Sequence, residues 1–514
     1  MNDALSAGRY RFPEKLIDRC FAVILLLIVA VCLFCSGMTY AMKLEGTWSN
    51  FICLPVGAAI LTLLAVSAPL PARGDPARFR RRMLCLSLAA GVFLYLLASQ
   101  TAVFCPWDGE ALYTGSRDLA AGEGSELLNT YLSVYQNNRL LTFLEELVWF
   151  VTLAIGKTNA YVLMLPLQIA MITVCIHLMF VCAEMTCGRE RPAVSAFVWL
   201  LAFVFIGLNP MITQNYSDIP AMLLIACCAY FTLCIRFGRH RVRHLFLLGL
   251  LSLFGYSLKP QVTFVLIAAV LTVLLPEGIR HIRQYRRWLV CAASLLCGLV
   301  LGFAGAEAAV NSLPLQLNRE AGVGIPHYLM LGLDTETMGM YSQEDYWIST
   351  SYATKAERTA GTLQLVAERV KEAGAGNMAL LFLRKLLTNY NDGSFAWYYT
   401  IRGGEIINWC DMPLTIPGLS AAIRDFYTGS GFTVFQGLAQ SVWLALLVLA
   451  ALGGLRSTPD GLSVLRLAVL GLTLFQEIFE ASPRYLYAYA PVYCLLAGGG
   501  LAYLLSRRKS PEKA

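Results

Sequence analysis

Residues 21–34 read FAVILLLIVAVCLF, a run without a single charged or amide side chain. Basic residues precede it and no A-x-A cleavage site follows it, so we expect a retained first helix over 17–37 rather than a cleaved signal peptide. Apolar runs of about 20 residues, the length that crosses a bilayer, recur along the chain. Backbone groups in hydrocarbon must hydrogen-bond within their own segment, which predicts that these runs are helices.

Composition points to the same fold class. The chain of 514 residues is 57% hydrophobic and only 14% charged, whereas a soluble domain carries about 25% charged residues. The short alternating strands of a β-barrel are not found. We therefore predict an all-α polytopic membrane protein with about 12 transmembrane helices, with the division between two short spans at Lys259-Pro260 left open. The predicted spans are 17–37, 51–70, 83–104, 160–184, 192–208, 217–236, 244–257, 260–276, 288–310, 434–453, 463–480 and 484–505.

Basic residues set the predicted orientation. The net charge is +7, and Arg and Lys crowd into short linkers at 78–82, 236–244 and 279–287 and into the tail at 507–509. The positive-inside rule places these linkers in the cytoplasm, which explains them without a nucleic-acid partner. Both termini are then cytoplasmic, and two long loops are extracytoplasmic.

This orientation divides the chain into five expected segments. They are an N-terminal three-helix segment (1–104), a first outer loop (105–159), central helices (160–310), a second outer loop (311–433) and C-terminal helices with a basic tail (434–514). The second loop is too long for a plain connector and predicts helices at 353–373 and 377–388.

The stretch at 140–156, LLTFLEELVWFVTLAIG, could be a further span, but it contains Glu145 and Glu146. Counting it as a span would move Arg189 and Arg191 outside and reverse every later basic linker. We therefore expect an interfacial helix, although the sequence alone leaves a span open.

Cysteines add little to the functional picture. Most of the 16 cysteines fall within apolar runs, where the side chain behaves as a small hydrophobe. Cys105 and Cys410 are the clearest loop cysteines and could form a disulfide.

CPWDGEALY at 105–113 ends the third apolar run and places Asp108 and Glu110 at its predicted outer mouth. Other polar residues recur at span ends on the same predicted side, and an ionisable group there is a functional hypothesis by default. They are Arg139 in YQNNR, Asp218 in NYSDIP, Lys259 in YSLKPQ, His327 in GIPHYLMLG, the polar residues of NYNDGSFAWYY at 389–399, and Glu480 and Arg484 in FEASPRYLY.

Each of these residues has a structural alternative. Asp108 is a candidate general base or a solvated acid at a helix end. Lys259 and Arg484 could bind a phosphate or anchor the helices at the interface. Asp218 could stabilise a helix N-terminus, and His327 could be a packed core histidine.

The expected chemistry involves no resident cofactor. No His, Cys or Asp grouping has zinc-ligand spacing, and there is no Walker loop, nucleophile elbow or dinucleotide fingerprint. No cofactor is expected, although the sequence leaves a divalent metal open. Acids and cations at one membrane face suit the transfer of a group away from a lipid-linked phosphate.

Seven short motifs occur in an order that resembles the GT-C superfamily of polyprenyl-phosphate-sugar-dependent glycosyltransferases. The chain looks most like the bacterial family-39-like members, which are relatives of the protein O-mannosyltransferases and the lipid A aminoarabinose transferase. The motifs are WDGE (107–110), YQNNRLLTF (135–143), NYSDIPAML (215–223), SLKPQ (257–261), HYLMLGLD (327–334), YNDGSFAW (390–397) and SPRYLYAYAP (482–491).

The resemblance implies a GT-C-like fold and a membrane glycosyltransferase that inverts configuration. Asp108 matches the catalytic base, with Glu110 and Asp118 as alternatives in the same loop. Lys259, Arg484 and Arg139 are the matches for cations that hold the donor phosphate. The implied substrate-binding residues are Asp218, His327 and Trp397. The indole of Trp397 and the rings of Tyr398 and Tyr399 are candidates for stacking on a sugar or for anchoring at the interface.

The implied partners are a polyprenyl-phosphate sugar donor, membrane lipids and a glycan, lipid or protein acceptor in the cell envelope. The chain departs from the superfamily in two ways. It has two extra helices before the catalytic loop, and YQNNR lacks a Pro-Pro pair, so the substrate specificity of those branches is not carried over. A lipid-linked-oligosaccharide flippase and a non-catalytic membrane assembly protein are the alternative functions.

Overall fold

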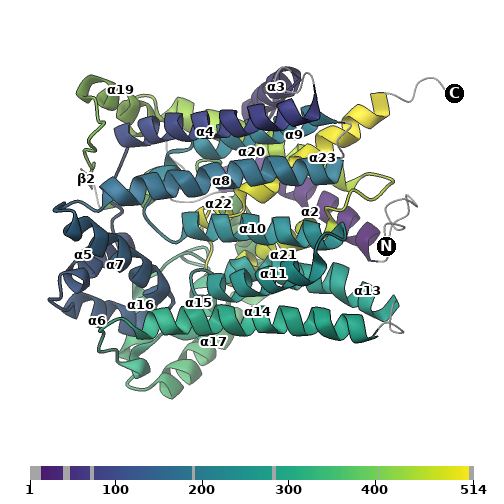
Figure 1. Ribbon diagram of the computed structural model, residues 1–514. Coiled ribbons are helices and arrows are strands. Elements are labelled where there is room, and N and C mark those ends of the chain that lie inside the picture. The colour runs from purple at the N-terminus through teal and green to yellow at the C-terminus, as the bar shows by residue number, and fades with distance from the viewer. Residues whose placement is uncertain are drawn as a thin grey trace.

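A computed structural model describes residues 13–38, 47–69, 75–187, 191–280, 285–403 and 406–508. Within these ranges the long helices run side by side in one bundle (Figure 1). Eight helical segments are long and apolar enough to cross a membrane, which supports the predicted all-α membrane fold. They are α2 (Glu14–Phe34), α3 (Asn50–Ser67), α4 (Pro76–Gln100), α8 (Tyr161–Cys187), α10 (Asp218–Arg236), Pro260–Glu277, α14 (Tyr285–Asn311) and α20 (Phe432–Gly454).

The other four predicted spans are also helical. One of the eight segments named above, Pro260–Glu277, is not a single regular helix. It consists of four consecutive elements: η5 (Pro260–Val262), α12 (Thr263–Ala269), the π-helical turn η6 (Val270–Leu274) and α13 (Leu275–Arg280). That all twelve ranges cross the membrane stays a prediction. The four further helical regions are α9 (Pro192–Ala202) with the π-helical turn η3 (Phe203–Gly207), α11 (Arg241–Tyr256), α21 (Ser463–Ile478), and α22 (Arg484–Tyr487) with α23 (Ala490–Arg508).

The first long loop folds into helices at one end of the bundle. It contains α5 (Asp108–Ala120), α6 (Glu126–Val134), η2 (Gln136–Asn138) and α7 (Arg139–Ala154). Figure 1 shows α5, α6 and α7 together at the end opposite the last turns of α23. α7 packs along α5 and against α14. Its place at the bundle end fits the interfacial helix that the charge pattern predicts.

The second long loop lies at the same end and along the side of the bundle. It contains η8 (Arg319–Ala321), α15 (Gly324–Gly332), α16 (Gln343–Ser351), α17 (Lys355–Tyr390), α18 (Trp397–Thr400), β1 (Arg402–Gly403), β2 (Ile406–Ile407) and α19 (Pro417–Thr428). The two helices predicted at 353–373 and 377–388 are the halves of α17. They meet at Gly374, whose φ of 68° is a conformation that favours glycine.

Backbone hydrogen bonds join the second loop to the residues directly before the first loop. Phe104 N donates to Asn408 O at 2.8 Å, and Cys410 N donates to Ala102 O at 2.8 Å. Cys105 and Cys410 are both buried free thiols, so the disulfide considered above is not formed. Instead the Cys105 sulfur accepts from Gln214 Nε2 and the Cys410 sulfur accepts from Asn159 Nδ2.

Buried cations fix the second loop to the helices. The Arg358 guanidinium donates to the backbone oxygens of Ser349, Glu320, Gly322 and Tyr352. The Lys385 ammonium donates to the backbone oxygens of Gly332, Glu477 and Phe479. Because a buried charge is costly without partners, these bonds hold α15, α17 and the end of α21 in one arrangement.

Small residues bring α11 and α14 close together. A Cβ at Gly298 would lie 2.1 Å from Phe246 O, and one at Gly302 would lie 2.2 Å from Leu250 O. Glycines four residues apart let helix backbones touch, which is a common way for helices to associate in membranes. The outer face of α14 is apolar and exposed, as a lipid-facing helix should be, with Leu289, Leu296, Val300 and Phe303 on it.

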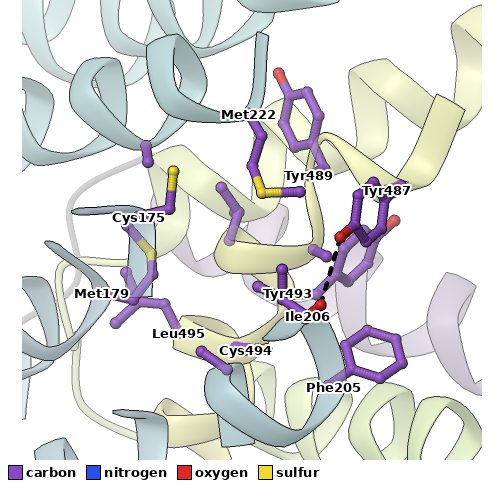
Figure 2. Packing of buried hydrophobic residues seen from close by; sticks show 14 of the residues in the cluster. Cys175, Met179, Phe205, Ile206, Met222, Tyr487, Tyr489, Tyr493, Cys494 and Leu495 are labelled. Carbon is purple, nitrogen blue, oxygen red and sulfur yellow. Dashed lines mark hydrogen bonds between the residues drawn. The ribbon is translucent and has the colours of Figure 1, made fainter. Parts of the chain in front are cut away.

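The segment from α22 into α23 lies at the centre of the hydrophobic core (Figure 2). Tyr487, Tyr489 and Tyr493 are fully buried there, and the Tyr487 hydroxyl donates to the Ile206 backbone oxygen at 3.4 Å. Tyr489 donates to Gln261 O at 2.8 Å, which ties this segment to η5. Arg484 lies three residues before Tyr487. The packing of the tyrosines in the core therefore fixes Arg484 next to the loop that carries Lys259.

Candidate functional site

Asp108 begins α5 and is half-buried. The residue before it, Trp107, has a φ of 60°, an uncommon conformation for a bulky side chain that is often found at functional sites. The indole of Trp107 holds this turn by donating to Arg402 O at 3.2 Å. The turn directs the Asp108 carboxylate toward the residues before α10, where the Tyr216 hydroxyl donates to Asp108 Oδ2 at 3.1 Å.

Further polar groups support the Tyr216 hydroxyl. Its oxygen lies 3.2 Å from Asn138 Oδ1, and Asn138 Nδ2 donates to the Tyr131 hydroxyl at 2.6 Å. Asn138 and Tyr131 come from the first loop, so α6, η2 and the start of α10 all contribute to the surroundings of Asp108. Such a network restricts the orientation of the carboxylate.

Lys259 and Arg484 share one carboxylate, that of Asp218. Lys259 is buried and forms an ion pair with Asp218 Oδ1, and Arg484 Nε lies 3.7 Å from Asp218 Oδ2. Asp218 is the first residue of α10, where the helix dipole favours a negative charge. Three of the predicted site residues are therefore brought together, although they come from distant parts of the chain.

Aromatic rings line the two cations. The Arg484 guanidinium carbon lies 4.8 Å from the centre of the Tyr216 ring, and Lys259 Nζ lies 5.1 Å from the centre of the Tyr485 ring. Tyr216 therefore contacts Arg484 with its ring and Asp108 with its hydroxyl. One side chain connects the predicted base to a predicted phosphate-binding cation.

Glu480 is a second carboxylate at this place. Its Oε2 accepts from the Tyr485 hydroxyl at 3.0 Å. Arg484, Asp108 and Lys259 are its charged neighbours, so Glu480 lies within electrostatic reach of the predicted base and of both cations.

Tyrosines surround Asp108 on the side of the loops. Burial raises the pKa of four tyrosines, and the Asp108 carboxylate raises each of them further: Tyr131, Tyr135, Tyr328 and Tyr341. These phenols come from the first loop and from the segment around α15. Two of the hydroxyls already donate within the loops, Tyr328 to Asn137 Oδ1 at 3.3 Å and Tyr341 to Gln343 Oε1 at 3.1 Å.

Glu145 is a buried acid that the sequence analysis did not select. Its Oε1 accepts from Asn215 Nδ2 at 2.9 Å, and Asn215 Oδ1 accepts from Gln168 Nε2 at 2.9 Å. Burial raises the pKa of Glu145 to about 8. Asn215 directly precedes Tyr216. Its bond to Glu145 connects this turn to α7, so Glu145 helps to position the turn before α10.

Two alternative acids and one cation lie apart from this cluster. Glu110 is exposed, and Asp118 forms an ion pair at 2.9 Å with the neighbouring Arg117. Arg139 is half-buried, and its Nε donates to Gln136 O at 3.1 Å, as expected of a residue that stabilises its own turn. Of the three acids, Asp108 is the one that accepts from Tyr216, and the bond recorded for Arg139 stays within its own turn.

The predicted substrate contacts at His327 and Trp397 do not fit their surroundings. His327 is buried, and its Nδ1 lies 2.8 Å from Ser349 Oγ, which agrees with the packing interpretation. Trp397 is fully buried in the hydrophobic core and offers no ring face to a ligand. Tyr398 packs on Phe432 and Arg402, whereas Tyr399 is exposed.

The tyrosines near Asp108 and Arg484 lie within the motifs named in the sequence analysis. Tyr135, Tyr216, Tyr328 and Tyr485 each belong to a motif that was selected for another residue. Charged residues near a membrane are rare and therefore conspicuous in a sequence, whereas aromatic residues at an interface are common. Within the part of the chain that the structure describes, no three His, Cys, Asp or Glu side chains form a group that could hold a metal ion.

Comparison with known families gives one match. A family described as "Conserved hypothetical integral membrane protein" matches residues 10–502. No curated protein and no solved structure matches the chain.

Proposed function

This chain belongs to that family of integral membrane proteins, and we propose that it is a glycosyltransferase. It would move a sugar from a polyprenyl-phosphate donor to an acceptor outside the cytoplasm, with inversion at the anomeric carbon. The acceptor would be a cell-envelope glycan, a lipid or a protein. The resemblance of the ordered motifs to GT-C enzymes supports the reaction class.

One observation carries the proposal: Tyr216 contacts Asp108 with its hydroxyl and Arg484 with its ring. A transfer from a lipid phosphate needs a base for the acceptor and positive charge for the leaving phosphate, held at a fixed separation. A single rigid ring between Asp108 and Arg484 meets this requirement.

In the proposed step the acceptor hydroxyl attacks the anomeric carbon of the donor. Asp108 takes the hydroxyl proton, the new glycosidic bond forms, and the bond between the anomeric carbon and the phosphate oxygen breaks. The electron pair leaves with the polyprenyl phosphate. Attack opposite the leaving group inverts the configuration.

The charge balance of the cluster is suited to a phosphate. Asp218 offsets part of the charge of Lys259 and Arg484, so both cations can stay buried before the donor binds. Arg484 Nε has no hydrogen-bond partner and its side chain is 19% exposed. Nε itself is buried and faces Asp218, so the exposed part of the guanidinium would meet the phosphate, which a guanidinium binds with its planar fork.

The test uses the purified full-length protein in lipid nanodiscs with a panel of polyprenyl-phosphate sugars and glycan acceptors. Asp108→Asn should lower turnover by about 10² to 10⁴-fold, the usual contribution of a general base. Donor binding should persist in this variant. Glu110→Gln is the matched control, because Glu110 lies in the same helical turn but is exposed, and it should keep full turnover. Full turnover in Asp108→Asn, or no binding of any donor by the wild type, would overturn the proposal.

The proposed sidedness is tested separately. Glu123 lies in the first loop and is exposed, and Val242 lies at the other end of the bundle and is 46% exposed. In cells, a membrane-impermeant thiol reagent should label Glu123→Cys and should not label Val242→Cys until the membrane is opened. The reverse pattern would place Asp108 on the cytoplasmic side.

A further inference from the structure

A cavity of about 280 Å³ lies beside the segment that leads into α22. Four parts of the chain form it: η1 (Ser36–Met38) after the end of α2, the start of α3 with the residues just before it, the end of α17, and the first turns of α20. Pro483 lines the cavity, and the next residue is Arg484 of the proposed site. The remaining lining residues do not belong to the cluster around Asp108.

The lining is polar and almost uncharged. Among the residues that the structure describes, the polar members of the lining are amides and hydroxyls, and none is a Lys, Arg or His. The single acid, Asp392, is fully engaged: its Oδ1 accepts from Ser394 N and Ser394 Oγ, and its Oδ2 accepts from Ala396 N. The described part of the lining contains no cation, and its one acid is already hydrogen-bonded, so these residues suit neither a phosphate nor a cationic ligand.

Three amides form a fixed wall of the cavity. Asn50 Nδ2 donates to Asn391 Oδ1, and Gln440 Nε2 lies 3.2 Å from both Asn50 Oδ1 and Asn391 Oδ1. The Gln440 oxygen accepts from Gly393 N at 2.8 Å. These groups connect α3, α17 and α20, so the wall keeps its shape without a ligand.

Two further polar atoms in the lining have no hydrogen-bond partner. They are Gln436 Oε1 and Thr388 Oγ1, on side chains of residues that are only 8% and 4% exposed. An unpartnered buried polar atom costs about 1–3 kcal/mol, so each of these atoms is expected to bond an ordered water or a bound ligand. One is an acceptor and the other is a donor and an acceptor, which matches a ligand hydroxyl.

Trp48 gives the cavity an aromatic side. A Cβ at Gly437 would lie 2.3 Å from Trp48 Cδ2, so only glycine lets this indole lie directly against α20. The ring is half-buried and lines the cavity. An aromatic face beside fixed amides and unpartnered oxygens is the combination that a sugar ring needs, because the ring has an apolar face and a polar edge.

We propose that this cavity binds a neutral sugar residue. Its volume is close to the lower end of the range of about 300–1,000 Å³ that holds drug-sized ligands, which allows one ring. Gln436 and Thr388 would bond the ring hydroxyls, and Trp48 would pack on the apolar face. The site stands independently of the transfer reaction proposed above, because it involves none of its acids or cations.

The test is saturation-transfer NMR on the full-length protein in phosphatidylcholine nanodiscs, with methyl glycosides of neutral hexoses as probes. At least one glycoside should bind the wild type saturably. Thr388→Val and Gln436→Met should each weaken this binding about tenfold. Thr232→Val is the matched control, because Thr232 Oγ1 is also buried without a partner but lies in α10, and its binding should equal that of the wild type.

Two results would overturn the proposal: no saturable binding of any hexoside, or equal binding by the wild type and both cavity variants. Circular dichroism and thermal unfolding check that each variant is folded, and Trp48→Leu gives a third probe that leaves the amides in place. A parallel sample contains a hexosyl diacylglycerol in the disc. Loss of the glycoside signal there identifies a membrane glycolipid as the source of the sugar, and an unchanged signal identifies a soluble glycan.

Discussion

The Tyr216 hydroxyl donates a hydrogen bond to Asp108 Oδ2 at 3.1 Å across 108 positions of the chain. Tyr216 directly follows Asn215, which Glu145 holds from α7, and its ring lies against Arg484. The bond therefore depends on α5, α7, α10 and α22 being correctly packed. Removing this hydrogen bond while keeping Asp108 tests how much the orientation of the carboxylate contributes to turnover.

Tyr216→Phe should lower turnover about 10- to 100-fold, since a hydrogen bond to a charged group contributes about 1.5–3 kcal/mol. The phenyl ring can still contact Arg484, so donor affinity should stay the same. Steady-state kinetics together with donor binding measures both quantities. Tyr399→Phe is the control, because Tyr399 is exposed. An equal loss of donor affinity and turnover would contradict an orienting role.

Lys259→Met should destabilise the protein by about 3–5 kcal/mol, because the buried Asp218 carboxylate loses its direct ion-pair partner and keeps only Arg484, whose Nε lies 3.7 Å away. The double variant Lys259→Met/Asp218→Asn should recover most of this loss, since both charges are then removed. Denaturation in detergent measures the difference. Lys157→Met, at an exposed lysine, should have no effect. If the double variant is no more stable than the single one, the pair does not account for the loss.

Arg484→Lys should raise the donor KM about tenfold while the fold is retained. The ammonium keeps the positive charge but loses the planar fork and the stacking on Tyr216. Donor titration at constant acceptor concentration measures the change. Arg139→Lys should leave the donor KM unchanged, because Arg139 bonds the backbone of its own turn. A larger effect at Arg139 would move the phosphate site to the first loop.

Gly298→Ala should destabilise the contact between α11 and α14 by about 1–3 kcal/mol, since the new methyl group would overlap Phe246 O. Gly305→Ala, one or two turns further along the same helix, meets no atom within 4 Å and should not destabilise the protein. Thermal unfolding of the two variants distinguishes a specific contact from a general effect of glycine. Equal melting temperatures would show that the backbones do not touch.

His327 should make stability depend on pH. Burial lowers its pKa from 6.5 to about 4, so the folded protein resists the proton that the unfolded chain takes up. The stabilising contribution is complete above about pH 6.5 and is lost as the pH falls toward 4, by about 2 kcal/mol at pH 5. Melting temperatures at pH 7 and pH 5 measure it. In His327→Asn, which can still bond Ser349, this pH dependence should be smaller.

Much of the site could be predicted from the sequence, but its pairings could not. Asp108, Asp218, Lys259 and Arg484 follow or precede apolar runs, so their positions near helix ends are local properties. Trp397 has the same kind of position and is nevertheless fully buried, while Tyr216 was overlooked and lies at the centre. The difference depends on neighbours that are far away in the chain.

The sequence by itself determined that the chain is helical and lies in a membrane, because each apolar run can satisfy its backbone only within its own helix. The tertiary structure decided which residues meet, namely that Asp218 pairs with both Lys259 and Arg484 and that Cys105 and Cys410 remain free thiols. Helix formation is a local property. Contacts between distant residues instead depend on how close glycine contacts, π-helical turns and buried cations align the helices. Hydropathy carries no information about that alignment.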